Sequence, residues 1–397
     1  MTQALAGVKI ADFSWVGAGP RATKDLADHG AIVVKVESAK RLDLGRVSPP
    51  FKDGRRDPDG SAFFGITNTS KLGVTINLGD PRGVVIARKL VDWADVVVEN
   101  FGKGYMERLG LDYPTLSAAR PELIMLSVSV AGRTGPMSSL RGYGNSAAAL
   151  SGMAALSGWP DRMPHMPPFA YGDVVAPMFA TLGVLAALEH RRQTGQGRHI
   201  DVSQVEPLVH VLEDVLVRAQ LEGTGTARLG NGSPVMSPHG VYPCRGHDQW
   251  VAIAARSDAD WQALALAVGI DAAAWPDLES RRANAEAIDG AIATWTARRD
   301  KHRAADMLAA AGVPAEAVND GRDVFTDPEL TDGHYIVIDH ATLGTCEMPA
   351  PPTHFSRSRV TVGPPPRLGE HNARVFQDFL GLDSAELSKL AAEGVLA

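Results

Sequence analysis

Short apolar runs rich in β-branched residues alternate with helix-like segments over the first half of the chain, and this alternation constrains the fold more than any other feature. The runs with the composition of buried parallel strands are residues 8–11, 31–36, 96–98, 123–130 and 198–202. Between two of them, Asp80 and Pro81 have the chemistry of a helix N-cap and first position, which predicts a helix over 80–93. Strands that alternate with helices predict an α/β fold with a mostly parallel sheet.

The pattern changes after a segment rich in Gly, Ser and Pro at residues 223–238, which is typical of a linker. Residues 241–244 and 250–254 flank a polar turn and predict a hairpin, and helices are predicted from about residues 258, 281 and 301. These elements indicate a smaller α+β domain. We expect the tail, with a last helix from about residue 370, to pack back on the first domain.

Composition and charge exclude several classes of protein. The chain has 397 residues, a net charge of −7 and no basic run, so a nucleic-acid partner is not expected. Its two cysteines are too few for a disulfide framework, and no residue spacing suggests a metal site. The N-terminus does not resemble a signal peptide, and no apolar stretch approaches the roughly 20 residues that span a bilayer. We therefore expect a cytoplasmic protein without a membrane segment.

A glycine motif follows the first predicted strand. Gly17-Ala18-Gly19-Pro20-Arg21-Ala22 matches G-x-G-x-x-A, and Glu37 ends the next strand, as in dinucleotide-binding proteins. The connection at residues 12–16 is longer and more polar than that tight turn requires. A glycine-rich turn between a strand and a helix is the commoner explanation.

Several segments together resemble the class III CoA-transferases, also called the CaiB/BaiF family, which includes formyl-CoA transferase, carnitine CoA-transferase and α-methylacyl-CoA racemase. The most specific match is Ala94-Asp95-Val96-Val97-Val98-Glu99-Asn100-Phe101 with Glu107-Arg108-Leu109-Gly110. Similar segments in the family's order are Asn68-Thr69-Ser70-Lys71, Arg192-Gln193-Thr194-Gly195-Gln196-Gly197, Ile200-Asp201-Val202-Ser203 and Leu368-Gly369-Glu370-His371.

The resemblance implies a Rossmann-like large domain and a smaller α+β domain. We place the large, CoA-binding domain at residues 1–222 and 325–397, and the linker and small domain at residues 223–324. It also implies a homodimer whose two chains interlock like linked rings. The implied substrates are an acyl-CoA and a free carboxylic acid, with no permanently bound cofactor and no metal.

The resemblance implies that Asp173, in Ala170-Tyr171-Gly172-Asp173, is the carboxylate that carries CoA as an aspartyl-CoA thioester. Asp173 precedes a predicted helix at 177–193, whose apolar residues nearly encircle it and predict burial. Free N–H groups at the start of that helix would stabilise an oxyanion. Local sequence alone leaves a second role open, because an Asp at such a place is commonly the cap of the helix.

Further residues match family positions near CoA: Val16, Ala18, Lys71, Asn100, Phe101, Arg108, Arg141 and Tyr143. Arginine suits phosphates because it donates two parallel hydrogen bonds. Lys40 and Arg41, after the second strand, are within reach of a ribose phosphate in this interpretation. No role is assigned to His165 or His239, since lone histidines are more often surface or core residues than ligands.

Two alternatives remain open. An α-methylacyl-CoA racemase needs a His where this chain has Tyr143, and a phenol with a pKa of about 10 is a poor base at neutral pH. A non-catalytic subunit of a heteromeric transferase would not need to keep Asp173. Gly144 replaces an acidic residue found in formyl-CoA transferase, which argues against formyl-CoA and oxalate as the substrates.

Overall fold

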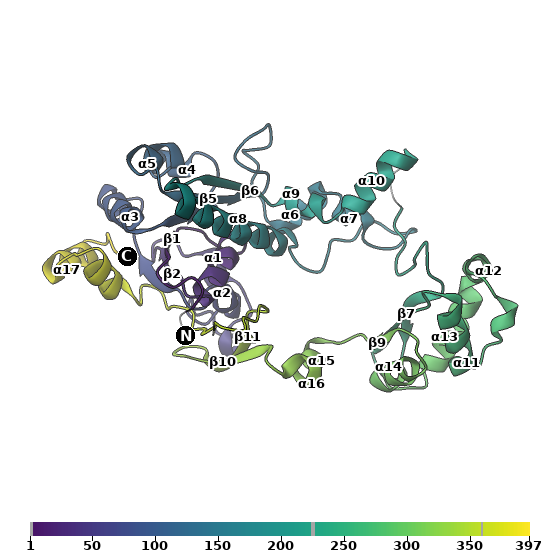
Figure 1. Ribbon diagram of the computed structural model, residues 1–397. Coiled ribbons are helices and arrows are strands. Elements are labelled where there is room, and N and C mark those ends of the chain that lie inside the picture. The colour runs from purple at the N-terminus through teal and green to yellow at the C-terminus, as the bar shows by residue number, and fades with distance from the viewer. Residues whose placement is uncertain (1–2, 224–226, 359) are drawn as a thin grey trace. The chain divides into compact units, whose positions relative to one another are not determined.

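The computed structural model describes residues 3–223, 227–358 and 360–397 (Figure 1). Within them the chain forms two compact units. The first unit contains residues 3–154, 166–223 and most of 332–397, and the second contains residues 155–165 and 227–331. Of the predicted linker, residues 224–226 lie outside the described part of the chain.

The first unit is built on a six-stranded sheet in the order β3-β2-β1-β4-β5-β6, with every neighbouring pair parallel. The strands are β1 Lys9–Asp12, β2 Ile32–Glu37, β3 Leu72–Thr75, β4 Val96–Glu99, β5 Ile124–Ser129 and β6 His199–Ser203. The predicted parallel α/β sheet is confirmed. The strand order reverses between β1 and β4, where the loops at the carboxyl ends diverge and leave a crevice.

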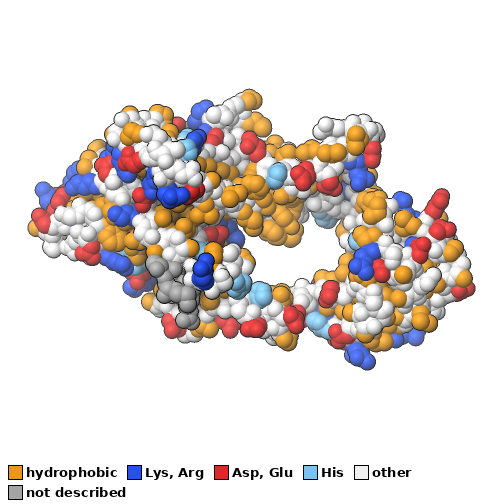
Figure 2. Space-filling view, in the orientation of Figure 1, with side chains coloured by type: hydrophobic (Ala, Val, Ile, Leu, Met, Phe, Trp, Pro, Cys, Tyr) orange, Lys and Arg blue, Asp and Glu red, His pale blue; other side chains and the backbone are white. Residues whose placement is uncertain are grey.

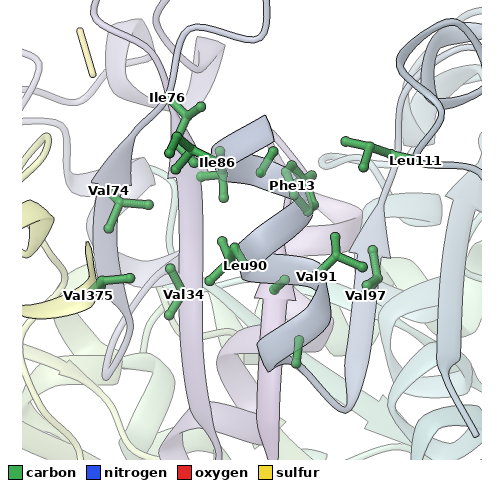
Figure 3. Close-up of a cluster of buried hydrophobic side chains, with 14 of the residues drawn as sticks. Phe13, Val34, Val74, Ile76, Ile86, Leu90, Val91, Val97, Leu111 and Val375 are labelled. Atoms are coloured by element: carbon green, nitrogen blue, oxygen red, sulfur yellow. The ribbon is translucent and has the colours of Figure 1, made fainter. Parts of the chain in front are cut away.

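Buried apolar side chains cover both faces of this sheet. On one face α1 (Ala18–Asp28) and α8 (Gly172–Thr194) pack against the strands. On the other, α3 (Pro81–Trp93) contributes Leu90 and Val91 to a cluster with residues of β2, β3 and β4 (Figure 3). Helix α3 has the predicted bounds, and the carboxylate of Asp80 accepts a hydrogen bond from the Arg82 backbone N–H as its cap.

The C-terminal segment belongs to the first unit from residue 332, while residues 325–331, which were predicted to belong there too, lie in the second. Its elements are the antiparallel hairpin β10 (Tyr335–His340) and β11 (Gly344–Pro349), a π-helical turn at Arg374–Phe379, and α17 (Ser384–Ala392). The Asn77 N–H donates to the Val395 carbonyl at 2.8 Å, and the Thr75 hydroxyl donates to the Leu396 carbonyl at 2.9 Å. The chain end is therefore bound to the edge of the sheet at β3.

Helix α8 differs from the sequence-based expectation in length and in burial. It begins at Gly172, five residues before the predicted start, so that Pro177 lies inside it. Only a third of its most apolar window is buried, and Met178, Leu182 and Leu185 are exposed. Figure 2 shows hydrophobic atoms gathered along this helix. By length and composition alone α8 is long and apolar enough to cross a membrane, so the expectation that no segment passes that test was wrong.

The second unit contains the separate antiparallel sheet β7-β8-β9. Strands β7 (His239–Pro243) and β8 (Trp250–Ala254) form the predicted hairpin, and β9 is Ala315–Ala317. Its helices are α11 Asp258–Val268, α12 Leu278–Ala283, α13 Ala285–Thr296, α14 Lys301–Ala310, α15 Gly321–Thr326 and α16 Pro328–Thr331. Trp261, fully buried, lies in the core that α11, α13 and α14 form with the sheet.

The remaining elements are short. The first unit has α2 Ala62–Thr67, α4 Tyr105–Leu109, α5 Tyr113–Ala119, α6 Gly144–Leu150, α9 Val205–His210 and α10 Glu213–Glu222. Helix α7, Met153–Leu156, includes residues of both units. Single 3-10 turns lie at Leu44–Val47, Lys52–Gly54 and Ala272–Ala274.

Candidate active site

A cavity of about 180 Å³ opens at the carboxyl edge of the sheet, at the crevice where the strand order reverses. Its walls come from the loops after β1, β4 and β5, and from residues at the start of α8 and the end of β6. The sequence-predicted residues that line it are Val16, Ala18, Asn100, Phe101, Arg141, Tyr143 and Asp173. Residues far apart in the sequence thus meet at one place.

Buried charges beneath the β1–α1 loop hold its backbone in an unusual shape. Lys35 Nζ donates to the Ser14 carbonyl at 2.7 Å and forms an ion pair with Asp43 at 2.9 Å. The other Asp43 oxygen accepts from the Val16 N–H at 2.9 Å. Val16 has a φ of 67°, which is strained for a β-branched residue. The surrounding hydrogen bonds keep this residue at the wall of the cavity.

Asn100 serves the same loop. Its Oδ1 accepts from the Trp15 N–H at 2.8 Å, and its Nδ2 donates to the Trp15 carbonyl at 2.7 Å. The neighbouring Phe101 ring meets the Trp15 ring edge-on, with 5.6 Å between centroids. Asn100 lines the cavity, and its side chain fixes the backbone of the loop that contains Val16 and Gly17.

The Asp173 carboxylate lies at the wall of the cavity with one hydrogen-bond donor on each oxygen. The Gly144 backbone N–H donates to Oδ2 at 3.1 Å, and Gln204 Nε2 donates to Oδ1 at 2.6 Å. Gly17 faces it from the β1–α1 loop, where an added Cβ would stand 3.2 Å from the Asp173 Cβ and Cγ. Asp173 is the second residue of α8 but does not cap it, because its oxygens are bound to other elements.

Two glycines allow this arrangement. A Cβ on Gly144 would stand 2.5 Å from the Asp173 backbone nitrogen, and one on Gly172 would stand 2.8 Å from the Gly144 Cα. The starts of α6 and α8 therefore touch backbone to backbone. The sequence predicted that free N–H groups at the start of α8 would stabilise an oxyanion. In the structure the first N–H groups of α8 donate to the Ala170 and Tyr171 carbonyls. The donor that reaches Asp173 comes from α6 instead.

Burial raises the pKa of the Asp173 carboxyl above its ordinary value. The hydrogen bonds from the Gly144 N–H and the Gln204 amide, and the positive charge of Arg21, act in the opposite direction without overcoming it. A carboxylate that is partly desolvated is more basic and a better nucleophile once it is ionised. The site therefore suits covalent catalysis by Asp173.

Lys71 was predicted to contact CoA, but it does not line the cavity. Its side chain is buried, and Nζ donates to Asp12 Oδ2 at 3.0 Å, the Pro20 carbonyl at 2.9 Å and Asn68 Oδ1 at 2.9 Å. A buried ammonium with three partners holds β1, α1 and the segment before β3 together.

A second cavity, of about 580 Å³, adjoins the first and shares Trp15, Phe101, Lys103 and Arg141 with it. Its further basic lining residues are Lys40, Arg41 and Arg108. The Arg41 guanidinium lies over the Trp15 ring, 5.7 Å from its centroid, and that of Arg108 lies 5.6 Å from the Tyr105 centroid. Arg108 thus lines this second, basic cavity and not the one that contains Asp173.

Sequence reasoning missed Ser129, Arg133 and Gln204, which also line the first cavity. Ser129 and Gln204 lie at the carboxyl ends of the neighbouring strands β5 and β6, joined by a 2.8 Å bond from the Gln204 N–H to the Ser129 carbonyl. A rule that polar residues at the ends of adjacent parallel strands meet would have found both. Across the described ranges, no group of three or more His, Cys, Asp or Glu side chains could hold a metal ion.

Comparison with known proteins agrees with this geometry. Residues 5–372 match the family described as CoA-transferase family III. The chain is 33% identical to succinyl-CoA–D-citramalate CoA-transferase of Chloroflexus aurantiacus, over 99% of this chain and 98% of that protein. It is 31% identical to succinate–glutarate CoA-transferase of Agrobacterium fabrum, over 94% and 95% of the two chains.

Among solved structures, a CaiB/BaiF family protein from Brucella suis superposes with a TM-score of 0.86 at 30% identity, covering 96% of this chain and all of that one. The match extends over the parallel sheet, the crevice and the second unit. The chain therefore belongs to CoA-transferase family III and is an enzyme of that class.

Proposed function

We propose that this enzyme moves CoA from an acyl-CoA to a free carboxylic acid through an aspartyl-CoA thioester on Asp173. The observation that carries the proposal is a carboxylate at a cavity wall, held by one donor on each oxygen and raised in pKa by burial. The activities of the relatives, on succinyl-CoA with D-citramalate and on succinate with glutarate, support a succinyl-CoA donor and a dicarboxylic acid acceptor.

The proposed reaction proceeds by four acyl transfers without any oxidant or cofactor. The Asp173 carboxylate attacks the thioester carbonyl of the donor, which expels CoA thiolate and leaves a mixed anhydride. The thiolate attacks Cγ of Asp173 and releases the donor's acid, which forms the aspartyl-CoA thioester. The acceptor carboxylate attacks that thioester, and the released thiolate attacks the acceptor's acyl carbon and frees Asp173.

The residues around Asp173 have matching roles in this proposal. When Cγ becomes tetrahedral, the negative charge grows on an Asp173 oxygen that the Gly144 N–H or the Gln204 amide can stabilise. The transfer also requires that water be kept from the anhydride, which would otherwise be hydrolysed. The basic second cavity suits the phosphates of CoA, with Lys40, Arg41 and Arg108 among its lining residues.

The alternatives have less support. Tyr143 lines the cavity in place of the His that a racemase would need as its base. A non-catalytic subunit would not need a carboxylate with a dedicated donor on each oxygen.

We also propose that the enzyme is a homodimer in which the second chain covers the exposed face of α8, in the interlocked manner of its family. Four exposed side chains on α8 are large and apolar: Met178, Phe179, Leu182 and Leu185. The segment with α9 and α10 adds Val211, Leu216, Val217 and Leu221. Exposed apolar residues that gather on neighbouring elements are typical of an interaction site.

The nucleophile is tested by intact-mass analysis after incubation with a panel of acyl-CoA thioesters. Wild type is expected to gain a CoA adduct that maps to Asp173. Asp173→Ala is expected to form none and to lose at least about 10³-fold in turnover. An adduct that persists in the variant, or one that maps elsewhere, would reject the assignment; α-proton exchange without any adduct would favour the racemase.

The raised pKa of Asp173 predicts the pH dependence of that adduct. Because only the carboxylate attacks, the rate of adduct formation should rise with pH and level off above a pKa higher than the ordinary value of about 3.9. The raised pKa also means that the folded chain binds this proton more tightly than the unfolded chain, so the buried charge lowers stability above the raised pKa. Asp173→Asn should therefore raise the melting temperature at about pH 7 more than at about pH 4.

Gly144→Ala is predicted to destabilise the enzyme by about 1–3 kcal/mol and to lower its rate at least about tenfold, because the new Cβ meets the Asp173 backbone and displaces the N–H donor. Gly290→Ala is the matched control, since a Cβ there meets nothing within 4 Å in α13. Urea denaturation and adduct formation measure the two effects. Equal behaviour of the two variants would contradict the close contact.

Leu182→Glu, on the exposed face of α8, is predicted to convert a wild-type dimer to monomers in light scattering after size-exclusion chromatography. Leu182 is 62% exposed. The control is Leu266→Glu in the second unit, at a leucine that is 85% exposed and should leave the dimer intact. A monomeric wild type, or a dimer that survives Leu182→Glu, would rule out this interface.

A further inference from the structure

Three side chains on the wall of the Asp173 cavity have a buried polar atom without a hydrogen-bond partner among the described residues: Ser129 Oγ, Arg133 Nε and Gln204 Oε1. Folded proteins rarely leave buried polar atoms unpaired, and each such atom calls for an explanation. Here all three belong to residues that line one cavity beside the proposed nucleophile. A polar ligand in that cavity is the simplest common explanation.

The orientation of the Gln204 amide follows from its neighbour. The Asp173 carboxylate accepts hydrogen bonds, so the amide nitrogen faces it, at 2.6 Å from Oδ1. The amide oxygen is therefore turned away from Asp173 and can only accept. Gln204 is 4% exposed, so water in the bulk does not pair with this oxygen.

The other two groups have the opposite preference. Arg133 Nε–H can only donate, and the Ser129 hydroxyl can donate or accept. The far edge of the Arg133 guanidinium is bound to the buried carboxylate of Glu99, and its backbone N–H donates to Asp201 at 2.7 Å. These contacts hold the Arg133 side chain at the cavity wall, where its Nε–H has no hydrogen-bond acceptor among the described residues.

Together the three groups offer two donors and one acceptor. A carboxylate accepts from Arg133 Nε–H and from the Ser129 hydroxyl, while a hydroxyl group next to that carboxylate donates to Gln204 Oε1. Lys103 and Arg141 line the same cavity and add positive charge. A plain dicarboxylic acid has no hydroxyl and would leave Gln204 Oε1 without a donor.

We propose that Ser129, Arg133 and Gln204 form the subsite for the non-reacting end of the acceptor acid, and that this subsite selects a 2-hydroxy dicarboxylic acid. The inference rests on the proposed transfer through Asp173 and names the acceptor class for it. Gln204 has two roles in this account, since one end of its amide holds the nucleophile and the other recognises the substrate hydroxyl.

The test compares acceptors that differ only by the hydroxyl. Full-length enzyme is first loaded with the acyl-CoA that gives the Asp173 adduct fastest. It is then offered malate against isotopically labelled succinate, and 2-hydroxyglutarate against glutarate. The ratio of kcat/KM for the hydroxy acid to that for the plain acid is the readout, because it cancels any effect of a variant on the nucleophile itself.

In the pair of acids that wild type uses better, it should favour the hydroxy acid by at least about tenfold in kcat/KM. The plain acid leaves the buried Gln204 Oε1 without a hydrogen-bond donor. In Gln204→Leu the ratio should fall to near one. In Ser129→Ala, KM should rise for both acids of the pair while the ratio stays high, since the serine binds the carboxylate that they share.

A wild-type ratio near one, or a ratio that Gln204→Leu leaves unchanged, would overturn the inference. If Gln204→Leu leaves the ratio unchanged and also raises KM for the CoA donor, Gln204 Oε1 instead accepts a hydrogen bond from an amide N–H of CoA. Failure of the proposed function is distinct from either, because then no donor forms an adduct on Asp173 in the first step.

Discussion

The site depends on a set of charges buried beneath the loop between β1 and α1. Asp12, at the end of β1, accepts from Lys71 and from the backbone of Ser14, and Lys35 joins Ser14 to Asp43. Charges in such a place are tolerated only when each has partners of the opposite sign or hydrogen bonds. Here some of those partners are backbone groups of the loop, at Ser14 and Val16, so satisfying the charges also fixes the loop conformation. That conformation includes the strained Val16 and brings Gly17 against Asp173.

The nucleophile is positioned by close backbone contact as much as by hydrogen bonds. Gly17, Gly144 and Gly172 lie where a Cβ would meet Asp173 or its neighbours. The β1–α1 loop and the start of α6 therefore approach the start of α8 more closely than side chains would allow. This packing explains the glycines of the apparent dinucleotide motif. A Cβ on Gly19 would meet the Ser14 side chain, and a Cβ on Gly17 would meet Asp173.

Helix α8 links the site to the assembly that we propose. Its start carries Asp173, one side packs on the sheet through Ala176, Ala180 and Val184, and another side is apolar and exposed. Small residues on the inner side let the helix approach the strands. Met178, Leu182 and Leu185 on the outer side are exposed to solvent in the described part of the chain, and a second chain would cover them.

Local features of the sequence were sufficient for much of the fold. The start of α3 was predicted because the Asp80 cap and Pro81 at the first position depend only on residues within one helical turn. The parallel sheet was predicted because runs of β-branched residues recur between helices. The prediction of Asp173 as the nucleophile came from the family resemblance and stays a prediction, although the structure places this residue at a cavity with Val16, Asn100 and Arg141.

Tertiary structure alone decided which partners the polar groups have. A lysine in a motif looks the same in sequence whether it binds a phosphate or a buried carboxylate, and so Lys71 was misassigned. The encircling apolar pattern of α8 does not tell whether its own chain covers each side, so its burial was overestimated. Gln204 and the Gly144 N–H were missed as partners of Asp173 because they reach it across 31 and 29 residues of sequence. Such contacts depend on how the strands and helix starts are arranged in space, which no local pattern records.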